Sequence, residues 1–330
     1  MGIALFWQGT AICLLTFLLT VLAELWLVPW LLKRRAGQPI LEIGPSWHLK
    51  KSGTPTLGGL GFIFAILLSF GVIAIRAGQG VTYSAVPLAL CLAYALSCAG
   101  IGFFDDWCKL KKRENKGLSA WQKYLLQILV ACVFLLLAVR FFGVDDSVKL
   151  PFATKRFSLG VFYYPLALLF LTGMANALNL TDGVDGLLSS TTAVFALLLL
   201  ALGLVDGEQN ALNTGALLLG GTLGFLCFNR HPAKVFMGDT GSLFLGGIVG
   251  GYGILSASLL LVLLACGVFV IETLSVMLQV IYFKITKGRR LFRMAPLHHH
   301  FEKCGFSEWR VVILFSCAAV FFAMLAFLGR

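Results

Sequence analysis

The sequence predicts an all-α polytopic integral membrane protein that folds as one domain over residues 1–330. Of its residues, 59% are hydrophobic and only 12% are charged, whereas soluble domains carry about 25% charged residues. The hydrophobic residues gather in runs long enough to cross a bilayer, which requires roughly 20 helical residues. Two soluble domains, which the length alone would suggest, are therefore excluded.

Ten apolar runs mark the expected transmembrane helices, at residues 6–32, 57–75, 83–104, 120–142, 161–178, 187–205, 211–228, 241–256, 259–283 and 311–329. The stretch 241–283 is continuous, but as one helix it would be about 65 Å long, twice the hydrocarbon thickness. We therefore expect two helices joined by a tight turn near Ser256. This gives ten spans, with both termini on the same side of the membrane.

The basic residues orient the chain. Twenty of the 26 Lys and Arg lie at Lys123 or within loops 33–56, 105–119, 179–186, 229–240 and 284–310, and the other six are Arg76, Arg140, Lys149, Lys155, Arg156 and Arg330. The positive-inside rule places these five loops in the cytoplasm and both termini outside. Because this asymmetry accounts for much of the net charge of +11, no nucleic-acid binding is expected. Residues 143–160 combine alternating polarity with turn residues, which predicts a small extracytoplasmic hairpin.

Asp105 and Asp106 follow the third apolar run and form the first candidate site. A helix C-terminus carries partial negative charge, so an acid there costs roughly 0.3–1 kcal/mol. Lys109 lies one turn further on and would offset only a few tenths of a kcal/mol, whereas a divalent metal bound together with a phosphate would offset more. An acidic pair at a membrane edge is also commonly a solvated feature without chemistry.

The loop before the second run has both a structural and a functional interpretation. Thr54 and Pro55 are typical of a helix start, as N-cap and first helical residue. Lys51 and Thr56, which lie nearby, would suit a phosphate or a uracil.

The loop after the fifth run carries Asn176, Asn179, Asp182 and Asp185 but no Lys or Arg. Its Asp-Gly pairs are typical of turns. Two carboxylates and two carboxamides without a basic partner also suit a sugar, a nucleoside or a metal.

Asp239 precedes the eighth run, where a helix N-terminus favours an anionic side chain and can bind phosphate. Phe236 would either pack in the core or stack on a base. Four glycines in this run have the spacing of close helix packing, namely Gly246/Gly250 and Gly247/Gly251.

Three consecutive histidines, His298, His299 and His300, precede the last run. Consecutive residues on a helix point about 100° apart, so the three cannot all bind one metal ion. We interpret His298 and His299 as hydrogen-bond donors to phosphate or sugar oxygens. Glu272 and Gln279 are seven residues apart and share one helix face, which brings Gln279 to the cytoplasmic end.

Taken together, these motifs resemble those of the polyprenyl-phosphate N-acetylhexosamine-1-phosphate transferases. The resemblance covers essentially the whole chain, and its most specific parts are residues 53–56, 104–106, 179–186, 235–242 and 294–302. The last of these is similar to the family members that use a muramoyl-pentapeptide donor.

The resemblance implies that phospho-MurNAc-pentapeptide passes from UDP-MurNAc-pentapeptide to undecaprenyl phosphate, giving a lipid-linked cell-wall intermediate and UMP. A UDP-GlcNAc donor is the alternative within the family. A transporter is the alternative outside it, because intramembrane acids can mark ion paths. The resemblance also implies Mg²⁺ as cofactor, a homodimer, inhibition by nucleoside antibiotics, and a place in the bacterial inner membrane with the active site facing the cytoplasm.

Residue roles follow from the same motifs. The implied catalytic residues are Asp105, Asp106, Asp239, Lys109, Lys116 and His298, with Asp239 as the metal ligand. The implied substrate-binding residues are Lys51, Thr56, Asn176, Asn179, Asp182, Gly183, Val184, Asp185, Asn229, Phe236, Gly238, Ser242, Gln279, Ala295 and His299. Two mechanisms remain open: direct attack by the lipid phosphate, with Asp105 or Asp106 accepting or orienting its last proton, and a covalent aspartyl-phosphate intermediate.

Overall fold

The computed structural model describes residues 2–34, 53–78, 85–112 and 117–330. Within these ranges the helices are α1 (Gly2–Lys33), α2 (Gly59–Gly78), α3 (Val86–Lys112), α4 (Ala120–Phe142), α5 (Tyr163–Thr181), α6 (Leu187–Asp206), α7 (Gln209–Asn229), α8 (Gly238–Leu255), α9 (Leu259–Ala265), α10 (Gly267–Ile285), α11 (Leu297–Lys303) and α12 (Glu308–Leu328). The strands are β1 (Ser147–Lys149) and β2 (Arg156–Ser158), and a 3-10 turn, Gly160–Phe162, precedes α5.

The fold is that of an all-α multi-pass membrane protein. In the described part of the chain, nine helices are long and apolar enough to cross a membrane. The expected run 241–256 corresponds to α8, which is buried from Thr240 to Ile254 inside the bundle. The predicted turn near Ser256 is confirmed, since α8 ends at Leu255 and Ala257 has a φ of 49°. The total of ten spans remains a prediction.

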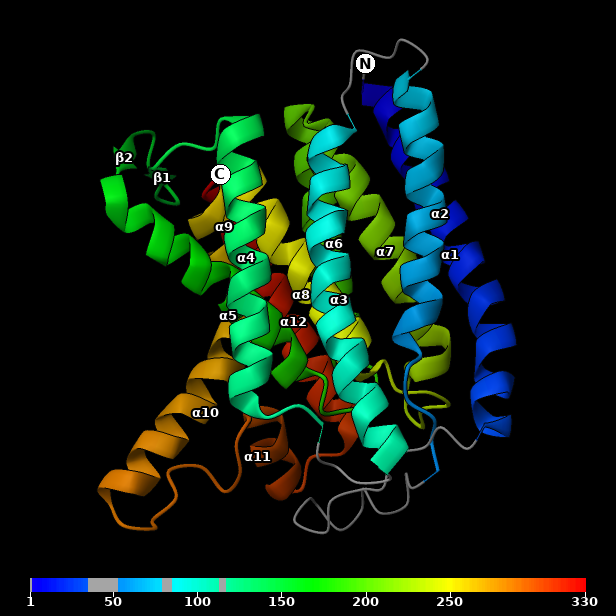
Figure 1. Cartoon of the computed structure of the whole chain (residues 1–330), viewed down its shortest axis with the longest axis vertical. Coiled ribbons are helices and arrows are strands. Elements are labelled where there is room, and N and C mark those ends of the chain that lie inside the picture. The colour runs from blue at the N-terminus through cyan, green and yellow to red at the C-terminus, as the bar shows by residue number, and fades with distance from the viewer. Residues whose placement is uncertain (1, 35–52, 79–84, 113–116) are drawn as a thin grey trace.

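The expectation of one helix over 259–283 was wrong. The chain breaks at Cys266 into the short α9 and the long α10, which leaves the bundle at the lower left of Figure 1. Gly267 directly follows the break, and a Cβ on it would lie 2.5 Å from the Phe322 ring of α12. Gly267 has a weak helix preference and packs tightly against α12. Both features accompany the break.

The expected helix start at Thr54 and Pro55 was also wrong, because α2 begins at Gly59. The preceding backbone instead pairs with the segment before α8. The Phe236 N–H donates to the Pro55 carbonyl at 2.8 Å, and the Gly58 N–H donates to the Phe236 carbonyl at 2.9 Å. These long-range hydrogen bonds override the local capping signal and bring Thr56 beside Gly238.

The predicted hairpin is present, with β1 and β2 antiparallel and Lys149 directly opposite Arg156. The Phe152 N–H donates to the Gly329 carbonyl at 2.9 Å, which joins the hairpin to the segment after α12. In Figure 1, α1 begins and α12 finishes at this end of the bundle, which we call the hairpin end. Which side of the membrane it faces remains a prediction.

Helix α8 lies between α3 and α5, and the predicted glycine packing is confirmed. A Cβ on Gly247 would lie 2.7 Å from the Ala95 Cα of α3, and one on Gly246 would lie 2.6 Å from the Ala175 Cα of α5. Near its start, α8 also touches Gly102 of α3 so closely that a Cβ there would overlap the Asp239 carbonyl. These approaches set the first turn of α8 against the acidic part of α3.

Candidate active site

Asp105 and Asp106 of α3 meet Asp239 of α8 at the end of the bundle opposite the hairpin, which we call the acidic end. One carboxylate oxygen from each of the three lies within 4.8 Å of the other two. The acidic pair does not close its helix, as the sequence suggested, because α3 continues to Lys112. Asp105 and Asp106 therefore lie away from the negative end of the helix dipole, and the repulsion between that end and their carboxylates is smaller than expected.

Asp106 caps the N-terminus of α8. Its oxygens accept hydrogen bonds from the backbone N–H groups of Asp239 at 3.2 Å and Thr240 at 2.9 Å, and from the Thr240 hydroxyl at 2.7 Å. A carboxylate in this place satisfies orphan N–H groups and favours the positive end of the helix dipole. Asp106 is fully buried, so its main effect is to fix Asp239 against α3.

Asp239 is surrounded by donors. Its Oδ2 lies 2.8 Å from Lys123 Nζ and 3.0 Å from Lys109 Nζ, and its Oδ1 accepts from Asn179 Nδ2 at 2.9 Å. Burial alone would raise the pKa of Asp239, but the two ammonium groups outweigh it and hold this pKa well below its usual range. Asp239 is therefore ionised at neutral pH.

The expected ion pair between Lys109 and Asp105 is present at 2.6 Å. The second oxygen of Asp105 accepts the Leu118 N–H at 2.8 Å. Three carboxylates thus face the two ammonium groups of Lys109 and Lys123. This all-oxygen donor set fits Mg²⁺, which binds one or two carboxylates and keeps several waters.

Lys123 was missed as a site residue, since the sequence counted it only as a basic residue beside a span. Its position follows from the start of α4, where Ser119 and Gln122 form a capping box. That motif is readable in sequence and fixes Lys123 in the first turn. Lys123 Nζ also lies 3.4 Å from Asn179 Oδ1, so one cation ties α4 to α5 and α8.

The two carboxamides of α5 have different partners. Asn179 donates to Asp239 and to the Ser242 hydroxyl, the latter at 2.8 Å. Asn176 instead pairs with Gln127 of α4, its Nδ2 donating to Gln127 Oε1 at 2.7 Å. Asn179 is therefore part of the acidic cluster, and Asn176 braces α5 against α4.

Asp182 caps the end of α5 and is also part of this site. Burial, together with the nearby carboxylates of Asp239, Asp106 and Asp185, raises the pKa of Asp182 to about 8. Asp182 is consequently mostly neutral at pH 7 and able to donate a hydrogen bond.

A second cluster holds the loop before α8. Asp185 Oδ2 accepts from the Ala233 N–H at 3.0 Å and lies 3.1 Å from His231 Nδ1, which is also 3.4 Å from Glu308 Oε2. His231 and Glu308 were not predicted. The side chain of Asn229 is engaged within the protein, accepting from Gly186 N–H and donating to the Val235 carbonyl.

Glu272 of α10 positions His298. Its carboxylate accepts the backbone N–H groups of Leu297 and His298 at 2.7 and 3.1 Å and lies 3.2 Å from His298 Nδ1. His298 Nε2 is buried, has no hydrogen-bond partner among the described residues, and abuts Gly183, where a Cβ would overlap it. His299 pairs with Glu302 at 2.7 Å.

The remaining predicted residues lie in several separate places. Thr56, Gly238 and Phe236 lie together on the paired segments before α2 and α8. Val184 packs in an apolar cluster with Leu187 and Val311.

Gln279 uses its amide to hold the backbone of Leu291 and Phe292, and Ala295 precedes α11. Lys51 and Lys116 lie outside the described residues.

A bundle that gathers carboxylates, ammonium groups and carboxamides at one end of its central helix has the features of a multi-pass membrane transferase. Residues 88–257 match the family model described as Glycosyl transferase family 4.

Curated relatives match nearly end to end and carry the name phospho-N-acetylmuramoyl-pentapeptide-transferase. The relative from Halalkalibacterium halodurans is 42% identical over 314 residues, covering 95% of this chain and 94% of the relative. The relative from Oceanobacillus iheyensis is 45% identical over 312 residues, 94% of each chain. The chain therefore belongs to the phospho-N-acetylmuramoyl-pentapeptide-transferase family, which confirms the resemblance seen in the motifs. These names do not favour the UDP-GlcNAc alternative.

Proposed function

We propose that the protein transfers phospho-MurNAc-pentapeptide from UDP-MurNAc-pentapeptide to undecaprenyl phosphate, releasing UMP, at the cytoplasmic face of the bacterial inner membrane. The observation that carries this proposal is the cluster of Asp105, Asp106 and Asp239 with Lys109 and Lys123. It lies in a chain that matches relatives of that name over nearly its whole length.

The cluster suits phosphoryl transfer between two polyanions. An oxygen of the lipid phosphate forms a bond to the sugar-bearing phosphorus, while the bond from that phosphorus to the UMP oxygen breaks. Lys109 and Lys123 supply positive charge where the diphosphate would lie. A phosphate monoester has a second pKa near ~6, so the acceptor is mostly dianionic at neutral pH, which favours direct attack over an aspartyl-phosphate.

The contacts of the two neighbouring acids favour different roles. Asp106 is engaged by three donors from α8. Asp105 has fewer fixed donors, since it accepts one backbone N–H, from Leu118, and pairs with Lys109. We therefore assign to Asp105 the task of orienting the acceptor or taking its last proton.

Asp239 is the proposed Mg²⁺ ligand, with Asp105 beside it. Mg²⁺ would neutralise charge on the diphosphate when bound. Asn179 and Asp106 fix the carboxylate and the backbone of Asp239, so the ligand is held in place by the protein itself. Ionisation of Asp239 at neutral pH is what a metal ligand requires.

The loop that follows α5 is the proposed donor site. A mostly neutral Asp182 suits a nucleobase better than a phosphate, because it can donate as well as accept a hydrogen bond. Phe236 is half-buried and presents a ring for stacking. The free Nε2 of His298, near Gly183, would reach the sugar-phosphate.

Paired donor assays test the proposal. Purified protein receives undecaprenyl phosphate with either UDP-MurNAc-pentapeptide or UDP-GlcNAc, and UMP and the lipid product are measured. We expect product only with the muramoyl donor. Product from UDP-GlcNAc alone would support the family alternative, and uptake of donor into vesicles without any lipid product would support a transporter.

The implied dimer is checked by measuring the particle mass. The implied inhibition by nucleoside antibiotics is checked by measuring UMP release as the inhibitor is added.

A further inference from the structure

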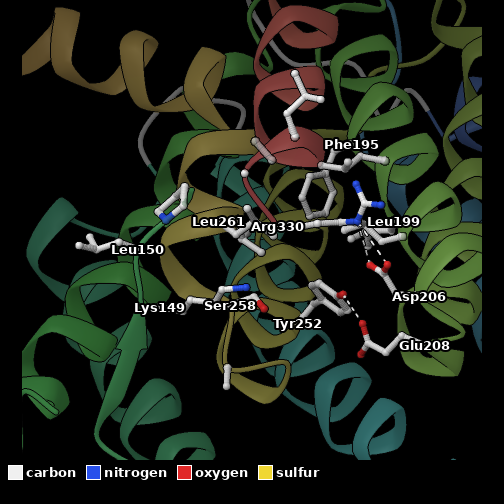
Figure 2. Close-up of a pocket in the computed structure, with 18 of the residues that line it drawn as sticks. Lys149, Leu150, Phe195, Leu199, Asp206, Glu208, Tyr252, Ser258, Leu261 and Arg330 are labelled. Carbon is white, nitrogen blue, oxygen red and sulfur yellow. Dashed lines mark hydrogen bonds and ion pairs between the residues drawn. The ribbon is translucent and has the colours of Figure 1, made fainter. Parts of the chain in front are cut away.

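A cavity of about 610 Å³ lies at the hairpin end, far from the acidic cluster. Its walls come from α6, α8 and α9, from the hairpin, and from the segment after α12, as Figure 2 shows. Its size is within the usual range of about 300–1,000 Å³ for sites that bind small molecules. The family function assigns nothing to this end of the molecule.

The cavity is lined unevenly. Leu199 and Leu202 of α6 and Leu261 of α9 form an apolar wall, whereas Lys149 and Arg156 of the hairpin form a basic side. In Figure 2 the Lys149 side chain extends toward Ser258, at the start of α9. A lining that is apolar on one side and cationic on the other suits an amphiphile better than a soluble ion.

The acidic groups of the cavity already have partners. Asp206 pairs with Arg330 at 3.2 Å, and Glu208 accepts a hydrogen bond from the Tyr252 hydroxyl at 3.2 Å (Figure 2). The Lys149 side chain has no hydrogen bond or ion pair with another residue of the described ranges. The Lys149 ammonium therefore leaves positive charge on the cavity wall, whereas Arg156 also interacts electrostatically with Asp145.

Lys149 and Arg156 are directly opposite each other across the two hairpin strands. Like charges in such a cross-strand pair repel and destabilise the hairpin. An anion held between the two side chains would remove that repulsion. The register of the hairpin thus sets the two cations of the cavity lining side by side, where a negatively charged ligand would fit.

We infer that this cavity binds one anionic phospholipid from the surrounding membrane. The lipid phosphate lies between Lys149 and Arg156, and one acyl chain follows Leu199, Leu202 and Leu261. Basic pockets between transmembrane helices bind lipid head groups in this manner. The bound lipid braces the hairpin against α6 and α9 and takes no part in the chemistry at the acidic end.

The test uses the full chain purified in a non-ionic detergent. Phosphatidylglycerol should raise the Tm and remain bound in mass spectra, because a ligand that binds only the folded state stabilises it. Phosphatidylcholine and inorganic phosphate should each have much less effect. An equal rise with phosphatidylcholine would overturn the role of the charge, and an equal rise with inorganic phosphate would overturn the role of the acyl chain.

Variants locate the site. The double variant K149Q/R156Q removes both cations. Each lost charge should weaken phosphatidylglycerol binding about fivefold, so the two together should weaken it roughly thirtyfold. K155Q is the matched control, since Lys155 is exposed on the same hairpin but does not line the cavity. L261W, which fills the apolar side, should also reduce lipid retention. UMP release should stay unchanged in all three. Equal loss in K155Q, or full retention in both the double variant and L261W, would overturn the proposal.

Discussion

The three carboxylates of the acidic cluster differ in the groups that donate to them. Asp106 receives backbone N–H groups of α8, Asp239 receives two ammonium groups and an amide, and Asp105 receives one ammonium group and one N–H. Asp106 is thus structural in effect, Asp239 is held ionised, and Asp105 is the least constrained. The sequence could place the three together but could not separate their roles, because the donors come from four different helices and the loop before α4.

Asp239→Asn should abolish UMP release at every Mg²⁺ concentration. The substitution keeps the size and the contact with Asn179 but removes the charge that Lys109, Lys123 and a metal all require. Initial rates of UMP release over a Mg²⁺ series check this. Substantial turnover at high Mg²⁺ would contradict the metal assignment.

Lys123→Gln should lower kcat about a hundredfold, the order expected for losing one positioned donor of charge stabilisation. It should also raise the pKa of Asp239, since Lys123 is the leading cause of its depression. Activity that needs ionised Asp239 is lost as pH falls through that pKa, so the acid limb of the pH–rate profile should move to higher pH. Lys111→Gln, on the exposed side of α3, is the control, and an unmoved acid limb in Lys123→Gln would refute the assignment.

Two glutamates buried in the helical bundle make a matched pair for testing how His298 is positioned. Glu272 holds His298 and the start of α11, whereas neither carboxylate oxygen of Glu24 has a hydrogen-bond partner among the described residues. Glu272→Gln should reduce kcat about ten- to hundredfold, as loss of an orienting partner does, and Glu24→Gln should leave it unchanged. Similar rates in the two variants would argue against a positioning role for Glu272.

At the scale of elements, hydropathy and spacing predict what each segment can do alone. The run 120–142 corresponds residue for residue to α4. The hairpin follows from local turn residues, and the turn near Ser256 follows from the length of the apolar stretch. The start of α2 and the break at Cys266 could not be predicted in this way. The start of α2 depends on backbone hydrogen bonds to residues 236–237, and the break at Cys266 coincides with the close approach of Phe322; both partners are far away in sequence.

Glycine substitutions should separate packing from helix preference. Gly247→Ala places a methyl group 2.7 Å from the Ala95 Cα, which should destabilise the bundle by about 1–3 kcal/mol through overpacking. Gly173→Ala, on α5 with nothing within 4 Å of its added Cβ, should be neutral or stabilising because Ala favours helix. Thermal unfolding in detergent compares them. A Tm for Gly247→Ala at or above that of Gly173→Ala would show that the α3–α8 contact is not tight.

At the scale of the whole molecule, described parts of the loops expected in the cytoplasm lie together at the acidic end, while their place in the cytoplasm stays a prediction. Residues from loops 105–119, 179–186, 229–240 and 284–310 all reach the acidic end, because α8 and α3 carry their functional residues at neighbouring helix ends. Lys123, His231 and Glu308 escaped prediction since each is a single polar residue at the edge of a loop or span. Only the folded bundle shows that they face carboxylates.

The orientation of the bundle is the last expectation, and it decides whether the site can meet its substrates. Nucleotide-linked sugars are made in the cytosol, so the proposed function requires the acidic end to face inward and the hairpin outward. In a background without the exposed Cys227, Cys304 and Cys317, Thr154→Cys on the hairpin should react with a membrane-impermeant maleimide in spheroplasts. Arg289→Cys, after α10 at the acidic end, should react only after the membrane is opened. Both side chains are exposed in the fold, so accessibility within the protein does not limit either reaction. The reverse pattern would put Asp239 outside, out of reach of the donor, and would refute both the positive-inside assignment and the proposed function.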